Sequence, residues 1–128
     1  MDTYEEKIKN IPYADVSVTS LDSSNYDVAF DYYDKGDCDN ANRYFIKYIQ
    51  KYPDGIFIVN AMYYKAECAY NNKNYDLALE GYQYVIDKPY SLFSESSLLK
   101  ASYVNFKNKN YRNALHLYTR LAEVAEYP

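Results

Sequence analysis

The chain has 128 residues, of which 48% are hydrophobic and 25% are charged, a balance typical of one globular domain. Eighteen acidic and fourteen basic side chains leave a net charge of −4, with no cluster of Lys or Arg. We therefore expect no nucleic-acid binding, and attachment to an anionic membrane surface is disfavoured. The sequence has no apolar run of about eighteen residues, so we expect no membrane span. Its N-terminus also lacks the basic region and apolar core of a signal peptide.

Residues 1–24 are predicted to form an N-terminal extension. A short charged helix is expected over residues 2–9, and Pro12 ends it because proline cannot continue a helix. Residues 13–24 are rich in Ser, Asp and Val and alternate briefly like a strand. Since a lone strand has no partner, this part is predicted to be an extended segment lying against the first helices.

Residues 25–128 are predicted to form one domain of three helical hairpins. Apolar residues recur with helical spacing over 25–34, 37–51, 56–71, 75–87, 91–108 and 111–126. Short polar turns join the two helices of each pair, so each pair is antiparallel. Proline-containing breaks at residues 52–55 and 88–90 separate the hairpins, which gives repeats of about 25–54, 55–90 and 91–128.

The three hairpins repeat one another in sequence. Small residues recur in the first helix of each pair at intervals of 37 and 36 residues: Ala29, Ala66 and Ser102. Three alanines follow twelve residues later: Ala41, Ala78 and Ala114. Larger residues keep the same register: Cys38, Tyr75 and Tyr111; Phe45, Tyr82 and Tyr118; Tyr48, Val85 and Leu121. Because no gap is needed within a unit, we infer an internal repeat in which small residues let two helices approach.

These units resemble tetratricopeptide repeats, which are helix-turn-helix units of about 34 residues. The resemblance rests on the small residues, on the aromatic set that begins with Phe45, and on Pro53 after the first hairpin. The units are two or three residues longer than usual, and such units look like those of bacterial envelope proteins, among them the Tol-Pal-associated periplasmic coordinators and the multi-repeat proteins of the Bacteroidetes. The resemblance covers residues 25–128. It implies an all-α, right-handed α-solenoid and a periplasmic or envelope location, with the cytoplasm as the alternative.

The reactive side chains give little support for catalysis. His116 is the only histidine, and no orienting carboxylate lies three or four residues from it. Three aspartates beside Gly36 lack the spacing of a calcium loop and are expected to cap helices. Cys38 and Cys68 follow no metal or redox spacing, so we expect two small apolar residues inside helices rather than a disulfide. The sequence predicts neither an enzyme nor a site for a metal or cofactor.

In tetratricopeptide repeats the first helix of each unit lines the concave face, so the resemblance places a peptide-binding groove there. The residues assigned to it are Tyr26, Phe30, Tyr33 and Asp34 from the first unit; Asn60, Tyr63, Glu67, Tyr70 and Asn71 from the second; Leu99, Tyr103, Phe106 and Lys107 from the third. Aromatic rings give a large contact area at little cost in conformational entropy. Of these, Tyr26, Tyr63 and Tyr103 are expected to be exposed, whereas Tyr33, Tyr70 and Phe106 are equally well explained by packing between helices.

The favoured function is a non-enzymatic scaffold that binds an extended peptide or a partner helix of another protein in this groove. The first alternative is assembly or self-association through the last helix, which carries a second apolar row, Tyr111, Leu115 and Ala122, where a repeat array needs a polar cap. The second alternative is glycan binding, because the faces of sugars stack on tyrosine rings.

Overall fold

The structure is a computed structural model that describes the backbone of residues 13–125 and the side chains of residues 24–125. Over this part of the chain it contains six helices and no strand. The helices are α2 (Tyr13–Asp34), α3 (Cys38–Lys51), α4 (Ile58–Asn71), α5 (Tyr75–Asp87), α6 (Ser94–Lys107) and α7 (Tyr111–Val124). The charged helix expected at residues 2–9 lies outside the described residues.

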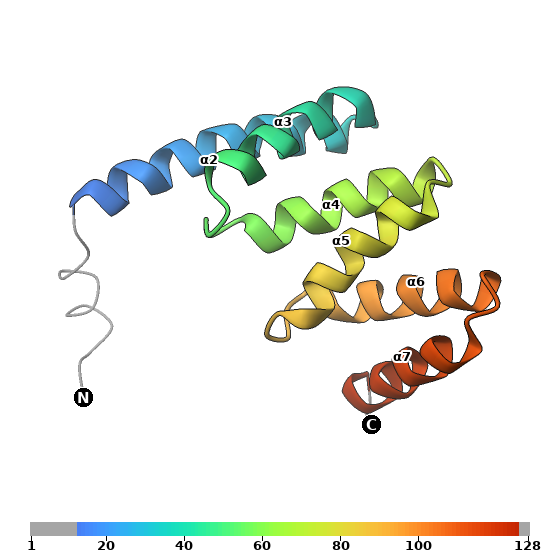
Figure 1. Ribbon diagram of the computed structural model, residues 1–128. Coiled ribbons are helices and arrows are strands. Elements are labelled where there is room, and N and C mark those ends of the chain that lie inside the picture. The colour runs from blue at the N-terminus through green and yellow to red at the C-terminus, as the bar shows by residue number, and fades with distance from the viewer. Residues whose placement is uncertain (1–12, 126–128) are drawn as a thin grey trace, which may run out of the picture.

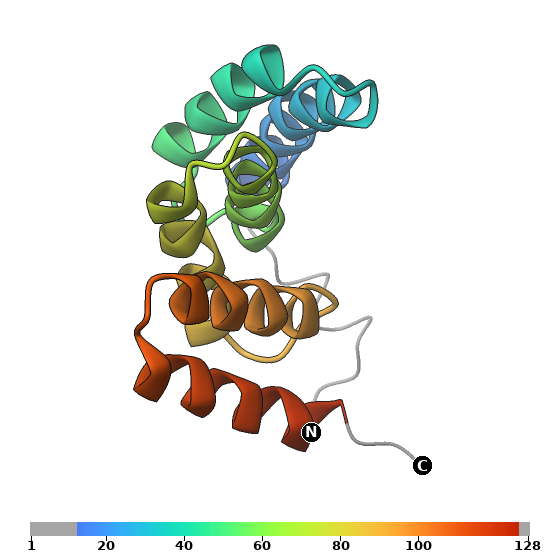
Figure 2. The same cartoon turned by 90° about the vertical axis from the view of Figure 1, so that its right-hand side faces the viewer.

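The helices form three hairpins that stack in chain order, with α2 and α3 at one end and α7 at the other (Figure 1). The view turned by 90° shows the same order of hairpins, with α7 again outermost (Figure 2). This all-α helical repeat solenoid confirms the predicted fold class. None of the helices in the described part is long and apolar enough to cross a bilayer.

One boundary differs from the prediction at the N-terminal end. The extended segment expected over residues 13–24 is wrong, because this stretch is the first half of α2. The whole of α2 contains neither glycine nor proline, so nothing interrupts its backbone hydrogen bonds even though Ser, Thr and Val have modest helix propensity.

A left-handed residue closes the first helix of each hairpin at equivalent positions. Gly36 has a φ of 82°, and Lys73 and Lys109 have φ values of 62° and 63°. The next amide in each turn donates to a carbonyl five residues earlier, as from Asp37 to Tyr32 at 2.9 Å. This geometry satisfies the carbonyls at the helix end and reverses the chain within a few residues.

Small residues hold the two helices of each hairpin close together. The predicted contact residues of the first two hairpins, such as Ala29 with Ala41 and Ala66 with Ala78, are fully or almost fully buried, which confirms that part of the repeat. Gly81 of α5 marks the closest approach, since a Cβ there would lie 2.6 Å from Ala66 Cβ and 2.7 Å from a backbone oxygen of α4. Only glycine fits this crossing without movement of a helix.

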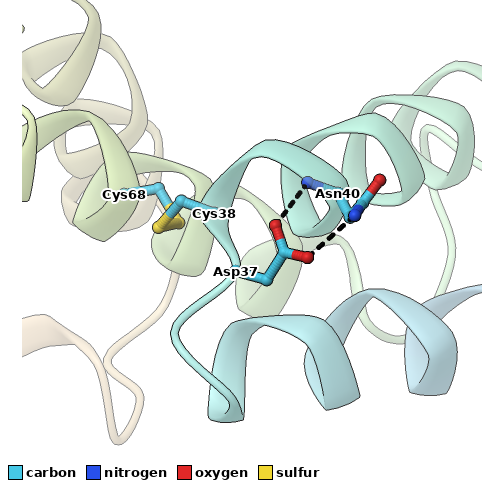
Figure 3. The surroundings of a disulfide bond; sticks show 4 residues. All are labelled: Asp37, Cys38, Asn40 and Cys68. Carbon is cyan, nitrogen blue, oxygen red and sulfur yellow. Dashed lines mark hydrogen bonds between the residues drawn. A yellow bond between two sulfur atoms is a disulfide. The ribbon is translucent and has the colours of Figure 1, made fainter.

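A disulfide joins the first hairpin to the second. Cys38 opens α3 and is bonded to Cys68 in α4, with a Cα–Cα distance of 5.6 Å (Figure 3). The expectation of two unbonded cysteines is therefore wrong. Beside the bond, Asp37 caps α3 by accepting hydrogen bonds from the backbone and side-chain amides of Asn40 at 3.1 and 2.7 Å. These two hydrogen bonds lower the pKa of Asp37, because they favour its charged form.

Candidate functional site

The first helix of each hairpin, α2, α4 and α6, carries the residues assigned to the groove. On α2, Tyr26 is buried, with only 8% of its surface exposed, so the expected exposure is wrong. Its ring stacks on Phe57 with centroids 4.5 Å apart, and Asn60 Nδ2 donates to its hydroxyl at 3.3 Å. Burial raises the pKa of Tyr26 to about 12. Tyr26 and Asn60 are thus contacts between hairpins.

The next two rings of α2 are half-buried. The centroids of Phe30 and Tyr33 lie 5.1 and 4.7 Å from that of Tyr64 in α4. Desolvation raises the pKa of Tyr33. Packing between helices accounts for both rings, and among the groove residues assigned to α2 only Asp34, at its end, is exposed.

On α4, Tyr63 is half-buried rather than exposed. Its hydroxyl shares a hydrogen bond of 2.8 Å with Ser96 Oγ of α6, and its ring centroid lies 4.7 Å from that of Phe93. Burial raises the pKa of Tyr63 to about 12. The ring joins the second hairpin to the third, as Tyr26 joins the first to the second.

Glu67 is also occupied within the fold. It is buried, pairs with Lys100 of α6 at 2.6 Å, and accepts a hydrogen bond of 2.7 Å from the hydroxyl of Tyr82. Burial, followed by this hydrogen bond, raises the pKa of Tyr82. A carboxylate with two strong partners is not free to orient a ligand. This pairing could not be predicted from local patterns, because Glu67 and Lys100 lie in different hairpins.

The far end of α4 remains accessible. Tyr70 is half-buried against Tyr75, with centroids 5.5 Å apart, and Lys100 Nζ lies 5.2 Å from its ring centroid. Asn71 is exposed as the last residue of α4. Tyr70 is therefore partly accessible to solvent, next to a cation.

On α6 all the assigned residues are exposed, and Leu99, Tyr103 and Phe106 form what we call the α6 stripe. Their exposed fractions are 50%, 39% and 55%, and helical spacing places them on one face. Lys107 Nζ lies 5.5 Å from the Tyr103 centroid and 5.3 Å from that of Tyr75. The α6 stripe is thus an apolar surface with a cation at its end.

The difference between the three helices follows from their order in the stack. Tyr26, Tyr63 and Leu99 are equivalent, and their exposure rises from buried to half-buried to exposed. The first residue is covered by α4 and the second by α6, whereas within the described residues no helix covers the third. The α6 stripe is therefore the part of the predicted groove that the fold leaves available.

The last helix also has an uncovered apolar row, which we call the α7 stripe: Tyr111, Leu115 and Tyr118. Tyr118 is 39% exposed, whereas its equivalents Phe45 and Tyr82 are fully buried. Tyr111 and Leu115 are exposed as well, and Phe106 of the α6 stripe lies 5.4 Å from Tyr111 between centroids. The two stripes thus meet at Phe106 and Tyr111 on the last hairpin.

Sequence reasoning missed a cleft between α5 and α7. It has a volume of about 900 Å³, with an acidic wall on α5 and a wall on α7 that contains His116 and Arg120. The α5 wall includes Asp76, Glu80 and Asp87, and their spacing along the predicted helix was the available signal. Among the residues described here, no group of three or more His, Cys, Asp or Glu is placed to hold a metal ion.

Comparison with known protein families gives two matches, both to the tetratricopeptide repeat, at residues 25–55 and 60–90. These matches coincide with the first two hairpins, apart from the N-terminal half of α2. No curated protein matches the chain. The family comparison thus supports the repeat, but it gives no information about a partner or a location in the envelope.

Proposed function

Since the chain contains tetratricopeptide repeats, we propose that it is a non-enzymatic scaffold that binds a segment of another protein along its first helices. Repeats of this kind generally act as protein–protein interaction modules, because their stacked helices present a long surface for a partner. The ligand is an extended peptide or a partner helix, and its contacts lie mainly on α6 and at the end of α4.

The exposed α6 stripe is the observation that supports this proposal most strongly. Large apolar side chains in a contiguous exposed row are rare in isolated soluble domains unless they bind something. The stripe lies near the partly exposed Tyr70, because Lys107 contacts both Tyr103 of the stripe and Tyr75, which packs on Tyr70. Apolar side chains of a ligand can therefore pack on both helices. Aromatic residues of this kind are enriched among the residues that dominate binding energy.

The charges beside the stripe suggest the chemistry of the ligand. Lys107 and Lys100 place two cations beside the aromatic rings, and Glu67 already neutralises Lys100. A carboxylate in the ligand is therefore best placed near Lys107, after two or three apolar residues on the stripe.

A peptide-library selection on the purified chain tests the proposal. We expect the selected peptides to be apolar and to contain an acidic residue. Tyr103→Ala and Tyr70→Ala should each lower the affinity for these peptides about tenfold or more. Ile46→Ala, at an exposed residue of α3 in the first hairpin, is the matched control and should leave binding unchanged. Peptides that bind all three variants equally well would place the site elsewhere.

We also propose that the chain folds in an oxidising compartment, as a periplasmic or envelope location would provide. The disulfide supports this, because such bonds persist outside the reducing cytosol. Alkylation of thiols in freshly lysed native cells distinguishes the two locations: a blocked Cys38 and Cys68 pair supports the envelope, and two alkylated thiols support the cytoplasm. Glycan binding has no further support and stays a prediction.

A further inference from the structure

Each new hairpin packs its first helix across both helices of the preceding one. For the first hairpin the central contact is Tyr64 of α4, whose ring lies among three aromatic rings. Its centroid is 5.1 Å from that of Phe30, 4.7 Å from that of Tyr33 and 6.2 Å from that of Phe45. Phe30 and Tyr33 come from α2 and Phe45 from α3, so one side chain fills a socket made by the two helices.

The second hairpin is covered by α6 at the same register, although Lys100, which contacts Glu67 and the Tyr70 ring, stands at the position of Tyr64. Phe93, just before α6, is equivalent to Phe57, just before α4, and the two rings pack on the equivalent tyrosines Tyr63 and Tyr26. Ser96 is equivalent to Asn60. Ser96 shares a hydrogen bond with the hydroxyl of Tyr63, and Asn60 donates one to the hydroxyl of Tyr26. These two contacts therefore recur at both interfaces between hairpins.

The third hairpin carries an equivalent socket that the described residues leave uncovered. Its members are Tyr103, Phe106 and Tyr118, which stand at the positions of Phe30, Tyr33 and Phe45. All three are exposed, whereas Phe45 is fully buried and Phe30 and Tyr33 are half-buried. We call this group the open socket. It combines members of the α6 stripe and the α7 stripe at the end of the stack (Figures 1 and 2).

We propose that the open socket binds an amphipathic helix of another protein, and that this helix inserts an aromatic side chain as Tyr64 of α4 does. The open socket stands at the position of two interfaces that the fold already uses, and its three aromatic rings match those that receive Tyr64 at the first of them. By the spacing of Phe57, Ala61 and Tyr64, the helix carries an aromatic residue just before its first turn, a small residue four positions later, and the inserted ring after three more. The position of Asn60 needs no hydrogen-bonding side chain here, because Leu99 replaces the tyrosine whose hydroxyl Asn60 contacts.

A second copy of this chain does not supply such a helix through α2. In the repeat register, α2 places Asp27 at the position of Tyr64 and Asp31 at the position of Cys68. Both aspartates are exposed, and Asp31 pairs with Lys35 at 2.9 Å. Stacking α2 of one copy on α7 of another would bury two carboxylates against aromatic rings, which is strongly unfavourable.

This inference deepens the proposed function and rests on it, because it names a helix as the ligand class and extends the surface onto α7. The two remain separable by mutation. Tyr118 belongs to the open socket and lies outside the groove of the first helices, whereas Tyr70 belongs to that groove and lies outside the open socket.

A helical peptide with the sequence of residues 56–72 is the direct probe, with Cys68→Ala to prevent oxidation. A lactam between positions 62 and 66 keeps it helical, since these positions face α5 in the fold and are not needed for the contact. Circular dichroism establishes its helicity, and fluorescence anisotropy measures its binding to the complete chain. We expect binding that is weakened about tenfold or more by Tyr64→Ala in the peptide and by Tyr118→Ala in the chain.

Two controls separate the possible outcomes. Ile46→Ala and Tyr70→Ala in the chain should leave the affinity for this peptide unchanged. Tyr70→Ala should still lower the affinity for peptides that bind the groove. A helical peptide that fails to bind, or that binds the Tyr118→Ala chain equally well, overturns the inference without affecting the groove. It is also overturned if light scattering shows a dimer of the chain that Leu115→Glu dissociates, because the surface is then occupied by a second copy.

Discussion

Removal of the disulfide is expected to lower the stability of the chain without changing its fold. The bond closes a loop between residues 30 positions apart and connects the first hairpin to the second. Two perturbations break it: reduction of the native chain, and the double substitution Cys38→Ala with Cys68→Ala. The helices keep their other contacts, including those around Tyr64, so the hairpins should remain stacked.

The size of the effect follows from the entropy of the unfolded chain. Closing a loop of this length lowers the conformational entropy of the unfolded state, which raises its free energy by about 3.5 kcal/mol at 25 °C. For a chain of 128 residues, that loss corresponds to a decrease of roughly 10 °C in the melting temperature. The double alanine variant should lose slightly more, because Cys68 is fully buried and its sulfur also fills space in the core.

Thermal unfolding followed by circular dichroism, with and without reductant, measures this difference. The double variant is the internal control, since reductant should change the melting temperature of the native chain and leave that of the variant unchanged. A thiol assay must show two free cysteines in the reduced sample. If the melting temperature does not change once both thiols are free, the loop-closure argument is wrong.

Three further perturbations test the packing, the turns and the buried tyrosines. Gly81→Ala should lower the free energy of unfolding by about 2 kcal/mol in urea titrations, because the added Cβ would lie 2.6 Å from Ala66 Cβ; an unchanged midpoint would mean that α4 and α5 have more room. Lys73→Gly should raise the same free energy by about 1 kcal/mol, since Lys73 has a φ of 62° that glycine adopts without strain; a lower stability would contradict this. Burial raises the pKa of Tyr26 from 10.0 to about 12, so its contribution to stability is complete below pH 10 and is lost as the pH rises to 12. Urea midpoints measured across that window should decrease less for Tyr26→Phe than for the native chain, and equal decreases would count against burial as the cause.

The repeat was predictable because it depends on residues within each hairpin. The spacing of small residues indicated where two helices cross, and Ala41 and Ala78 are fully buried at those crossings. The turn at Gly36 was likewise evident from local sequence. These features depend only on contacts between helices that follow one another in the chain, and the spacing of residues along each helix predicts such contacts.

The exposure of the groove residues was not predictable, because it depends on the next hairpin. Tyr26 and Tyr103 are both groove tyrosines in first helices. The second hairpin covers Tyr26, whereas no described helix covers Tyr103. The disulfide escaped prediction for the same reason, since Cys38 and Cys68 meet only when two hairpins stack. Glu67 illustrates the same limit, because its partners Lys100 and Tyr82 come from later helices.

The most direct test of a binding surface on the last hairpin is an NMR titration of the complete chain with the helical peptide of residues 56–72. The account predicts that backbone amide shifts change mainly in α6 and α7, around the α6 stripe and Tyr118, while α2 and α3 stay unchanged. Shift changes concentrated in the first hairpin, or none at saturating peptide, would contradict it.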